Sequence, residues 1–356
     1  MNQKVLIAMS GGVDSAVAAL LAHKLGYHIA GITMRLWDEN GRLPDDLVTP
    51  AEDDNVRDAR AIADRLGFPH HTVTLGESFY RDVVTPFIDS YIAGQTPNPC
   101  VICNRDIKFG KLLEIARDMG YDRLATGHYA RVEKDASGRY LLKKAKDEAK
   151  DQSYFLWTLS QDVLSSVLFP LGEYTKPEIR AMAAEHGFVN AHRSDSQDIC
   201  FIPGGDYISF IQSQVKQDFP AGDFVDTEGR VLGQHAGLIR YTVGQRKGLG
   251  IALGEPMFVK AKDPLQNTVT LSRNEALFSR EITATGIHWI ACDSLPAPTR
   301  LQAKIRYRHV AADAVVEQID ATRILVRFDT PQRAPAPGQS LVLYDGDIVI
   351  GGGIIE

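Results

Sequence analysis

Apolar and polar positions follow two alternating periods through the first two hundred residues. Short apolar runs such as KVLIAM (4–9) and YHIAGITM (27–34) have the length and composition of buried strands. Segments such as SAVAALLAHKLG (15–26) and VRDARAIADRLG (56–67) instead repeat apolar residues at helical spacing and close with glycine. This alternation predicts an α/β fold with a doubly wound parallel sheet, covered by helices on both faces.

The pattern changes after about residue 205. Glycine and basic residues rise through residues 206–275, and from residue 280 onward short β-branched runs are separated by turn residues. Such runs predict a small all-β barrel or sandwich at the C-terminus. Because 356 residues exceed one ordinary core, we expect three domains: an α/β catalytic domain (1–205), a small central domain (206–278) and a C-terminal β-barrel domain (279–356).

The remaining bulk features narrow the class of protein. Residues 35–54 are polar and interrupted by proline, which predicts a mobile insertion. The apolar run at the N-terminus is broken at once by two glycines and Asp14, so it indicates a first buried strand rather than a signal peptide. No apolar run approaches the ~20 residues of a membrane-spanning helix. We therefore expect a cytoplasmic protein with no membrane contact, whose four cysteines are reactive or ligating thiols rather than a disulfide framework.

Net charge changes this picture only locally. The value of −6 argues against a nucleic-acid partner, but two stretches are strongly basic. Between residues 230 and 262 six basic side chains accompany a single acid, Glu255, and residues 300–309 (RLQAKIRYRH) carry no acid at all. Local patches matter more than totals for binding a phosphate backbone. Taken alone, however, either stretch also fits an ordinary solvated surface.

The first candidate site is Ser-Gly-Gly-Val-Asp-Ser at residues 10–15, between the first strand and the first helix. Two glycines let backbone amides approach an anion, and the helix N-terminus directs its N–H groups and positive dipole end toward it. The hydroxyls of Ser10 and Ser15 can add donors. An anionic Asp14 would repel phosphate, so we expect it to act through Mg²⁺. The loop has neither the lysine of a Walker A site nor the spacing of a dinucleotide loop.

This loop resembles the pyrophosphate-binding loop of the ATP pyrophosphatase superfamily, whose members adenylate a substrate and release pyrophosphate. Further motifs are similar to those of one family, the bacterial tRNA-specific 2-thiouridylases, in order along nearly the whole chain: GQTPNPCVICNRDIKFG, ATGHYAR, KDQSYFL, DSQDICFI, YTVGQRKGLGI, RYR and GGGIIE. The resemblance implies that the C2 oxygen of a wobble uridine is adenylated with ATP and replaced by sulfur. It also implies two macromolecular partners, the anticodon arm of a tRNA and a persulfide donor protein of a cysteine desulfurase relay, and a monomer.

The resemblance assigns roles to two cysteines. Cys103 matches the family nucleophile, and Cys200 matches the cysteine that carries the persulfide and can form a disulfide with Cys103. A carbonyl oxygen becomes a good leaving group as an AMP ester, and thiolate attack on a sulfur–sulfur bond then delivers the sulfur. Cys292 matches no motif and fits a buried structural thiol.

Cys100 departs from the family pattern, in which many relatives carry an aspartate proposed as an acid or base. Three thiols at one site also suit a [4Fe–4S] cluster held by Cys100, Cys103 and Cys200. A zinc site with His128 as fourth ligand ranks below both, and thioredoxin-like chemistry uses C-x-x-C in another fold context. We rank the persulfide relay first and the cluster second.

The same resemblance assigns ligand contacts. It places the ATP phosphates on residues 8–15 and the adenosine near two further residues, so the predicted ATP contacts are Ala8, Met9, Ser10, Gly11, Gly12, Val13, Asp14, Ser15, Met34 and Gly127. A wobble base must leave the anticodon stack to react, and the predicted tRNA contacts are Asn98, Pro99, Cys100, His128, Lys150, Asp151, Gln152, Arg306, Tyr307 and Gln339.

Two other readings compete with a thiouridylase. Another ATP pyrophosphatase, adenylating a free metabolite, predicts AMP formation without RNA and leaves the second half of the chain unexplained. A nucleotide- or RNA-binding module without chemistry needs neither Cys103 nor Cys200. The intact phosphate loop together with both motif cysteines argues against that module.

Overall fold

The computed structural model describes residues 3–36, 54–188 and 199–356. Its chain forms two compact units. The first comprises residues 1–83, 100–203 and 347–349, and the second comprises residues 84–99, 204–346 and 350–356. The predicted domain boundaries at residues 205 and 278 stay predictions. Of the expected insertion at residues 35–54, Arg35 is the buried last residue of a strand, and residues 37–53 lie outside the described residues.

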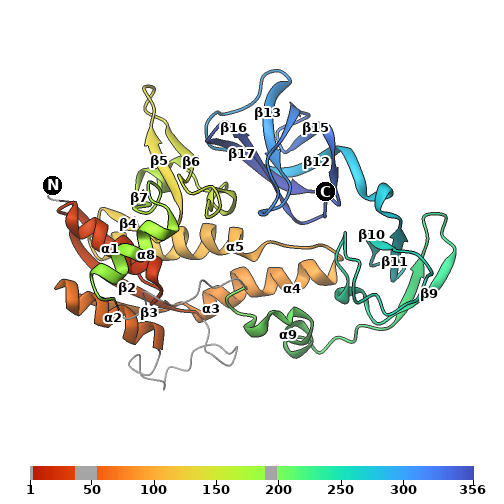
Figure 1. The fold of residues 1–356 in the computed structure, drawn as a ribbon, viewed down its shortest axis with the longest axis horizontal. Helices are drawn as coiled ribbons and strands as arrows, with labels where there is room; N and C mark the ends of the chain where they lie inside the picture. Colours follow the sequence, from red (N-terminus) through yellow and green to blue (C-terminus); the bar gives the residue numbers. More distant parts are fainter. Residues whose placement is uncertain (1–2, 37–53, 189–198) are drawn as a thin grey trace. The chain divides into compact units, whose positions relative to one another are not determined.

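The first unit is built on a five-stranded parallel sheet (Figure 1). Its strand order is β3 (His70–Thr74), β2 (His28–Arg35), β1 (Lys4–Ala8), β4 (Arg123–Ala125) and β7 (Val167–Leu168). In the central strand Val5, Leu6 and Ile7 are completely buried. Burial on both faces explains why this strand reads as a continuous apolar run, and the predicted α/β fold is confirmed.

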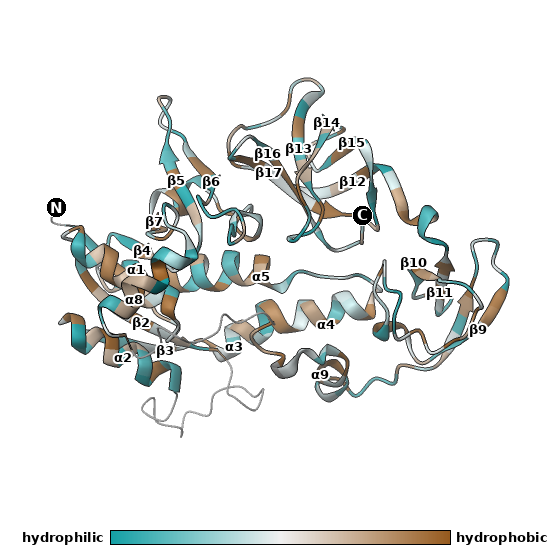
Figure 2. Ribbon diagram, in the orientation of Figure 1, coloured by the Kyte–Doolittle hydropathy of each residue, from teal (hydrophilic) through white to brown (hydrophobic). Residues whose placement is uncertain are grey.

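Helices α1 (Val13–Lys24), α2 (Asp54–Leu66) and α8 (Lys176–Glu185) share one apolar core with Val5 and Ile7 of β1. Side chains alternate across a strand, so Leu6 faces the opposite side of the sheet. Helix α6 (Leu112–Asp118) packs against β4. Helix α2 buries Val56, Ala59, Ile62 and Ala63 along one stripe, and Figure 2 shows hydrophobic and hydrophilic residues alternating along it.

The rest of the first unit consists of short elements, including a hairpin that sequence periodicity did not predict. The hairpin strands are β5 (Ala130–Lys134) and β6 (Tyr140–Lys144), and Lys143 pairs with Ile348. The helical elements here are α3 (Gly76–Phe79), the π-helix η2 (Tyr80–Val84), α5 (Pro99–Ile102), the π-helix η3 (Cys103–Lys111), the 3₁₀ turns η4 (Ser153–Phe155) and η5 (Pro203–Gly205), and α7 (Gln161–Ser165). Of these, η2, α5 and η5 each include one or two residues of the second unit.

The second unit contains a four-stranded sheet in the order β10, β11, β8, β9. These strands and their neighbours are α4 (Thr85–Ile92), α9 (Tyr207–Gln214), β8 (Gly222–Val225), β9 (Val231–His235), η6 (Leu238–Arg240), β10 (Phe258–Asp263), β11 (Thr268–Ser272) and η7 (Asn274–Leu277). Phe224, Val259 and Leu271 are fully buried in its core, beside the ring of Tyr241.

Six antiparallel strands complete the second unit: β12 (Phe278–Trp289), β13 (Thr299–Lys304), β14 (Ala312–Gln318), β15 (Arg323–Arg333), β16 (Ser340–Asp345) and β17 (Ile348–Ile355). They follow the order β12-β15-β14-β13-β16-β17, and β12 also pairs with β17. That pair closes the sheet, so the predicted C-terminal β domain is a barrel and not a sandwich. Closure leaves no unpaired edge along these strands.

None of the helices in the described part of the chain combines the length and the apolar character needed to cross a bilayer.

Candidate active site

The candidate site of the first unit lies where the strand order reverses. β1 has β2 on one side and β4 on the other, so the loops after β1 and β4 leave the same edge of the sheet beside each other. In open α/β sheets, ligands bind at such a switch point, beyond the carboxyl ends of the strands. Here the two loops are residues 9–12 and 126–129, and both belong to motifs that the sequence singled out.

The first loop is fixed by glycine and by a serine hydroxyl. Gly11 has φ +71°, and a Cβ there would lie 2.7 Å from the carbonyl oxygen of Asn55. Ser15 Oγ accepts a hydrogen bond from Ser10 N and donates one to Gly12 O, each at 3.1 Å. The Ser15 hydroxyl therefore stabilises the loop and is already engaged. Gly12, the N-cap of α1, provides no side-chain cap, which leaves the positive end of the helix suited to an anion.

The second loop packs directly on the first turn of α1. A Cβ on Gly127 would lie 2.9 Å from the backbone of both Asp14 and Ser15, so only glycine fits this approach. Of the other predicted ATP contacts, Met9 and Val13 are buried, and Met34 is partly buried near the end of β2. Their contacts with a nucleotide stay predictions.

The carboxylate of Asp14 is bound by two other side chains of the first unit. Lys176 Nζ lies 2.8 Å from both carboxylate oxygens of Asp14, and Tyr129 donates its hydroxyl to Asp14 Oδ1, also at 2.8 Å. Lys176 is 6% exposed and Tyr129 is 2% exposed. The buried ammonium neutralises the carboxylate beside the anion site, so the repulsion expected between Asp14 and a phosphate is compensated within the chain.

Sequence reasoning missed Lys176, although the sequence contains a signal for it. Thr175 and Glu178 form a capping box, which makes Lys176 the first residue of α8. A cation is unfavourable at a helix N-terminus because the dipole is positive there. A lysine in that position indicates an acidic partner elsewhere, but the sequence does not identify Asp14 as that partner.

The same geometry bears on Mg²⁺. This ion requires near-octahedral oxygen ligands and is usually held by one or two carboxylates together with waters and phosphates. The one carboxylate of the phosphate loop already accepts hydrogen bonds on its oxygens from Lys176 and Tyr129. The arrangement does not fit direct coordination of Mg²⁺ by Asp14.

Three thiols come together elsewhere in the first unit. α5 carries Cys100, the π-helix η3 begins at Cys103, and Cys200 follows the undescribed segment 189–198. Burial is the main cause of the raised pKa of Cys103, and Cys200 and Cys100 each add a smaller electrostatic increase. The pairing of Cys103 with Cys200 stays a prediction, and all four cysteines of the chain are free thiols.

Burial controls the acidity of these thiols. Cys103 is 7% exposed, and desolvation raises its pKa to about 12. Cys100 and Cys200 have exposed surface, but protein atoms crowd around them, and desolvation raises the pKa of each as well. A thiol that must act as a nucleophile needs a compensating positive charge.

Lys108 supplies positive charge at this position. It lowers the pKa of Cys100, Cys103 and Cys200, and no carboxylate in the described part of the chain forms an ion pair with it. In an α-helix, five residues turn the chain about 140° away from the starting side. η3 is instead a wider π-helix, which brings Lys108 nearer to the side of Cys103. Sequence periodicity gives no indication of this.

A metal centre receives no support from these side chains. Within residues 3–36, 54–188 and 199–356, no group of three His, Cys, Asp or Glu side chains is placed to hold a metal ion. His128, considered as a zinc ligand, has its Nδ1 2.7 Å from Thr126 Oγ1, and its ring packs against Phe109 and Phe169. Burial and Lys108 lower the pKa of His128 well below its usual value, so the ring is neutral.

Two of the predicted tRNA contacts, Asp151 and Gln152, form hydrogen bonds within the first unit. Asp151 is buried and accepts hydrogen bonds from Ala145 N, Ser153 N and Ser153 Oγ. Gln152 Oε1 accepts from Tyr129 N at 3.0 Å. Both side chains therefore hold the segments beside the Gly127 turn. Their contacts with tRNA, like those of His128, Lys150, Asn98, Pro99 and Cys100, stay predictions.

In the second unit, Arg306 donates through Nη2 to Val243 O at 3.0 Å and to Ala334 O at 2.8 Å. Tyr307 lies half-buried beside Lys304, whose Nζ is 5.9 Å from the ring centre. Arg306 thus ties the barrel to the segment that precedes residues 245–254. Gln339 donates to the backbone at Thr96. Contacts of these three residues with tRNA stay predictions.

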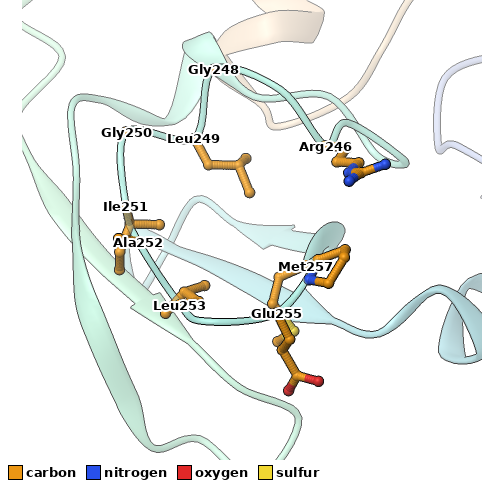
Figure 3. Close-up of a pocket in the computed structure, with 10 residues that line it drawn as sticks. Arg246, Gly248, Leu249, Gly250, Ile251, Ala252, Leu253, Glu255 and Met257 are labelled. Atoms are coloured by element: carbon orange, nitrogen blue, oxygen red, sulfur yellow. The ribbon is translucent and has the colours of Figure 1, made fainter.

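The basic stretch of the central region is smaller than its sequence indicated. Arg230 is paired with Asp226 and Glu228, and the ammonium of Lys262 is buried. Arg246 and Lys247 are exposed. They begin a glycine-rich loop around a cavity of about 510 Å³ (Figure 3), whose lining is mostly apolar and comprises Arg246, Gly248, Leu249, Gly250, Ile251, Ala252, Leu253, Glu255, Pro256 and Met257.

Comparisons with known proteins agree with this arrangement. A family profile described as the tRNA methyl transferase HUP domain matches residues 3–204, one described as the PRC-barrel domain matches residues 208–273, and an aminomethyltransferase beta-barrel domain matches residues 279–355. The chain is 46% identical to the tRNA-specific 2-thiouridylase MnmA of Clostridioides difficile, across 100% of this chain and 99% of that one. It is 47% identical to MnmA 1 of Caldanaerobacter subterraneus, covering 100% and 98%.

The chain belongs to the tRNA-specific 2-thiouridylase family. The family resemblance inferred from the motifs is confirmed by similarity over the full length of the chain. In this 2-thiouridylase family member, the phosphate loop and the three thiols lie in one compact unit.

Replacing Lys176 with methionine tests the compensation of Asp14. The variant leaves an uncompensated carboxylate beside the phosphates, so we expect the dissociation constant for ATP to rise at least about tenfold, or ~1.4 kcal/mol. Isothermal titration calorimetry measures this. Lys146→Met is the matched control, because Lys146 is exposed and its ion pair with Glu178 is long, at 3.9 Å. Unchanged ATP affinity in Lys176→Met would contradict the assigned role.

Replacing Lys108 with glutamine tests the charge at the thiols. Loss of the cation raises the pKa of Cys103 further, so less thiolate is present at any given pH. In a Cys100→Ser background, we expect Cys103 to be alkylated about three- to tenfold more slowly at pH 8, with the rate–pH profile displaced to higher pH. Quantitative mass spectrometry of the Cys103 peptide measures this rate. Lys111→Gln, on the same helix and paired with Glu114, should leave the profile unchanged; an identical profile for both variants would refute the role of Lys108.

Proposed function

We propose that this protein is an ATP-dependent tRNA 2-thiouridylase that replaces the C2 oxygen of the anticodon wobble uridine with sulfur. The observation that carries the proposal is identity of 46% or 47% over the whole chain to proteins with that activity in their names. A phosphate-binding loop and neighbouring thiols within the same unit support it.

The first half-reaction is adenylation. The N-terminus of α1 and the backbone of the Gly11–Gly12 loop bind the phosphates of ATP, while Lys176 keeps Asp14 neutralised beside them. The C2 oxygen of the uridine attacks the α-phosphate, and pyrophosphate leaves. The oxygen is then bonded to AMP, which is a far better leaving group than an oxide.

The second half-reaction is sulfur transfer. A donor protein passes its outer persulfide sulfur to Cys200. That sulfur attacks C2 of the adenylated base, AMP leaves, and the base is joined to Cys200 through a sulfur–sulfur bond. Cys103 thiolate attacks the Cys200 sulfur, which forms a Cys103–Cys200 disulfide and leaves the transferred sulfur on C2. An external dithiol reduces the disulfide before the next turnover. The electrostatic influence of Cys200 on Cys103 supports this route.

Because of Cys100, a [4Fe–4S] cluster mechanism is an alternative to the persulfide relay. A third thiol would allow three ligands to a [4Fe–4S] centre, with one iron left open. Among the residues that the structure describes, however, no three His, Cys, Asp or Glu side chains are placed to hold a metal. We therefore assign sulfur to the Cys103–Cys200 pair and no step to a cluster.

The proposed partner is the anticodon arm of a tRNA. Asn98, Pro99 and Cys100 border the extruded base in this proposal, and the exposed Arg246 and Lys247 of the central region bind phosphate. The proposal also includes a persulfide donor protein, a monomeric state and a cytoplasmic location. An enzyme that adenylates a free metabolite would instead release AMP without RNA.

Thiol variants separate the relay from the cluster. In anaerobically purified protein the relay predicts little iron or acid-labile sulfide, and tRNA thiolation that survives Cys100→Ser but is abolished by Cys103→Ser or Cys200→Ser. Intact-protein mass spectrometry of Cys103→Ser should show one extra sulfur on Cys200 after incubation with a persulfide donor. Cys292→Ser is the control. About four irons per chain, lost together with activity in Cys100→Ser, would establish the cluster instead. Full thiolation activity without Cys103 and Cys200 would contradict both mechanisms, whereas no thiolation by the unaltered protein would leave only a binding module.

Removing the charges of Arg246 and Lys247 tests whether the central region binds tRNA. We expect Arg246→Ala combined with Lys247→Ala to weaken tRNA binding and to reduce the slope of log K against log salt by about 1.5 to 2. Filter binding at several salt concentrations measures both quantities. Lys24→Ala combined with Lys134→Ala removes the same charge from exposed positions of the first unit and should leave the slope unchanged. Equal effects of the two pairs would mean that net charge, and not this loop, governs binding.

A further inference from the structure

A loop of the C-terminal barrel, residues 336–339, is hydrogen-bonded to segment 95–99, which leads into the cysteine motif. Both belong to the second unit. Thr96 N donates to Pro337 O at 2.8 Å, and Gln339 Nε2 donates to Thr96 O at 2.7 Å and, at 3.4 Å, toward Pro97 O. The backbone of Thr96 therefore has both its donor and its acceptor satisfied by this one loop.

Gly338 allows the loop to approach the segment closely. It is buried, with φ +90°, a conformation that side-chain-bearing residues rarely adopt. A Cβ at this position would lie 3.0 Å from Cβ of Gln95 and 3.1 Å from Thr96 N. Any larger residue must push the segment away from the barrel.

Gln339 is itself held in place by the barrel. Its backbone N donates to Ala336 O, and its carbonyl accepts from Ile355 N at 2.8 Å, near the end of β17. Gly338 N donates to Ile355 O at 3.0 Å. The amide that reaches Thr96 thus projects from a loop fixed to the last strand of a closed barrel.

The next residues of the segment transmit this constraint. Pro97 and Pro99 have fixed φ, and Asn98, which precedes proline, is restricted to extended conformations. Few torsions remain soft between Thr96 and the start of α5 at Pro99. Fixing the backbone at residue 96 therefore also fixes the direction in which Asn98 and Pro99 are presented.

We propose that Gly338 and Gln339 are positioning residues, which hold segment 95–99 so that Asn98 and Pro99 meet the target base in a set geometry. The inference rests on the proposed thiouridylase function for its catalytic consequence. The sequence-based prediction for Gln339 assigned its side chain to tRNA, whereas the role proposed here rests on the bond from its amide to the backbone of Thr96.

Two variants disrupt the contact between the barrel loop and Thr96 in independent ways. Gln339→Leu keeps the size of the side chain and removes the donor, whereas Gly338→Ala leaves Gln339 in place and adds a Cβ against Thr96. For each we expect kcat of tRNA thiolation to fall at least about tenfold while the dissociation constant for tRNA changes less than about twofold. The double variant should be no worse than the poorer single variant, since both lose one contact.

Hydrogen exchange provides a readout that needs no catalysis. In both variants the amide of Thr96 should exchange faster, while amides of the barrel strands stay protected and the melting temperature shows that the chain is folded. Gln302→Leu is the matched control, because Gln302 lies on β13 of the same barrel and bonds only across its surface to Asp313.

The outcomes are distinct. Weaker tRNA binding with unchanged kcat and unchanged exchange would make Gln339 an RNA contact and overturn the proposal. Unchanged exchange at Thr96 would overturn it whatever the activity. If the unaltered protein itself thiolates no tRNA, the proposed function fails, whereas faster exchange in the two variants would still establish that the barrel loop holds the segment.

Discussion

The ion pair between Asp14 and Lys176 is the interaction on which the phosphate loop depends. A helix N-terminus attracts anions, yet the loop places a carboxylate within its first turn. The nearly buried ammonium at the start of α8, together with the hydroxyl of Tyr129, resolves this conflict by binding both carboxylate oxygens. Because α8 is far along the chain from α1, the phosphate loop is complete only when the sheet and its flanking helices have assembled.

A similar balance of burial and charge governs the thiols. Excluding water protects a persulfide from side reactions, but it also raises the pKa of Cys103 to about 12 and so suppresses the thiolate that must attack. Lys108 opposes this effect at all three thiols. In both parts of the first unit a lysine offsets the cost of a group that function requires. The family resemblance assigned a role to neither lysine, although Lys108 lies within the motif GQTPNPCVICNRDIKFG.

The difference between what the sequence predicted and what it missed follows from distance along the chain. Periodicity predicted the parallel sheet and the β domain because strand and helix patterns are local, and the loop at residues 10–15 was recognisable because its chemistry is contiguous. Lys176 was missed because its partner lies on a different helix. Lys108 was missed because the π-helix η3 changes which residues share a side. The hairpin β5–β6 was missed because its strands are short and half exposed.

Gln339 shows that a residue assigned to a ligand can also bind the protein backbone. Sequence resemblance relates a residue to a function but does not distinguish a contact with substrate from a contact with the backbone that presents the substrate-binding residues. The hydrogen bond to Thr96, and the tight approach of Gly338 beside it, favour the second explanation. The prolines at 97 and 99 strengthen it, because a stiff segment can be oriented from one end. Catalysis that needs a base held in one geometry gains from such rigidity, since a small displacement at residue 96 is passed on to Asn98 rather than absorbed.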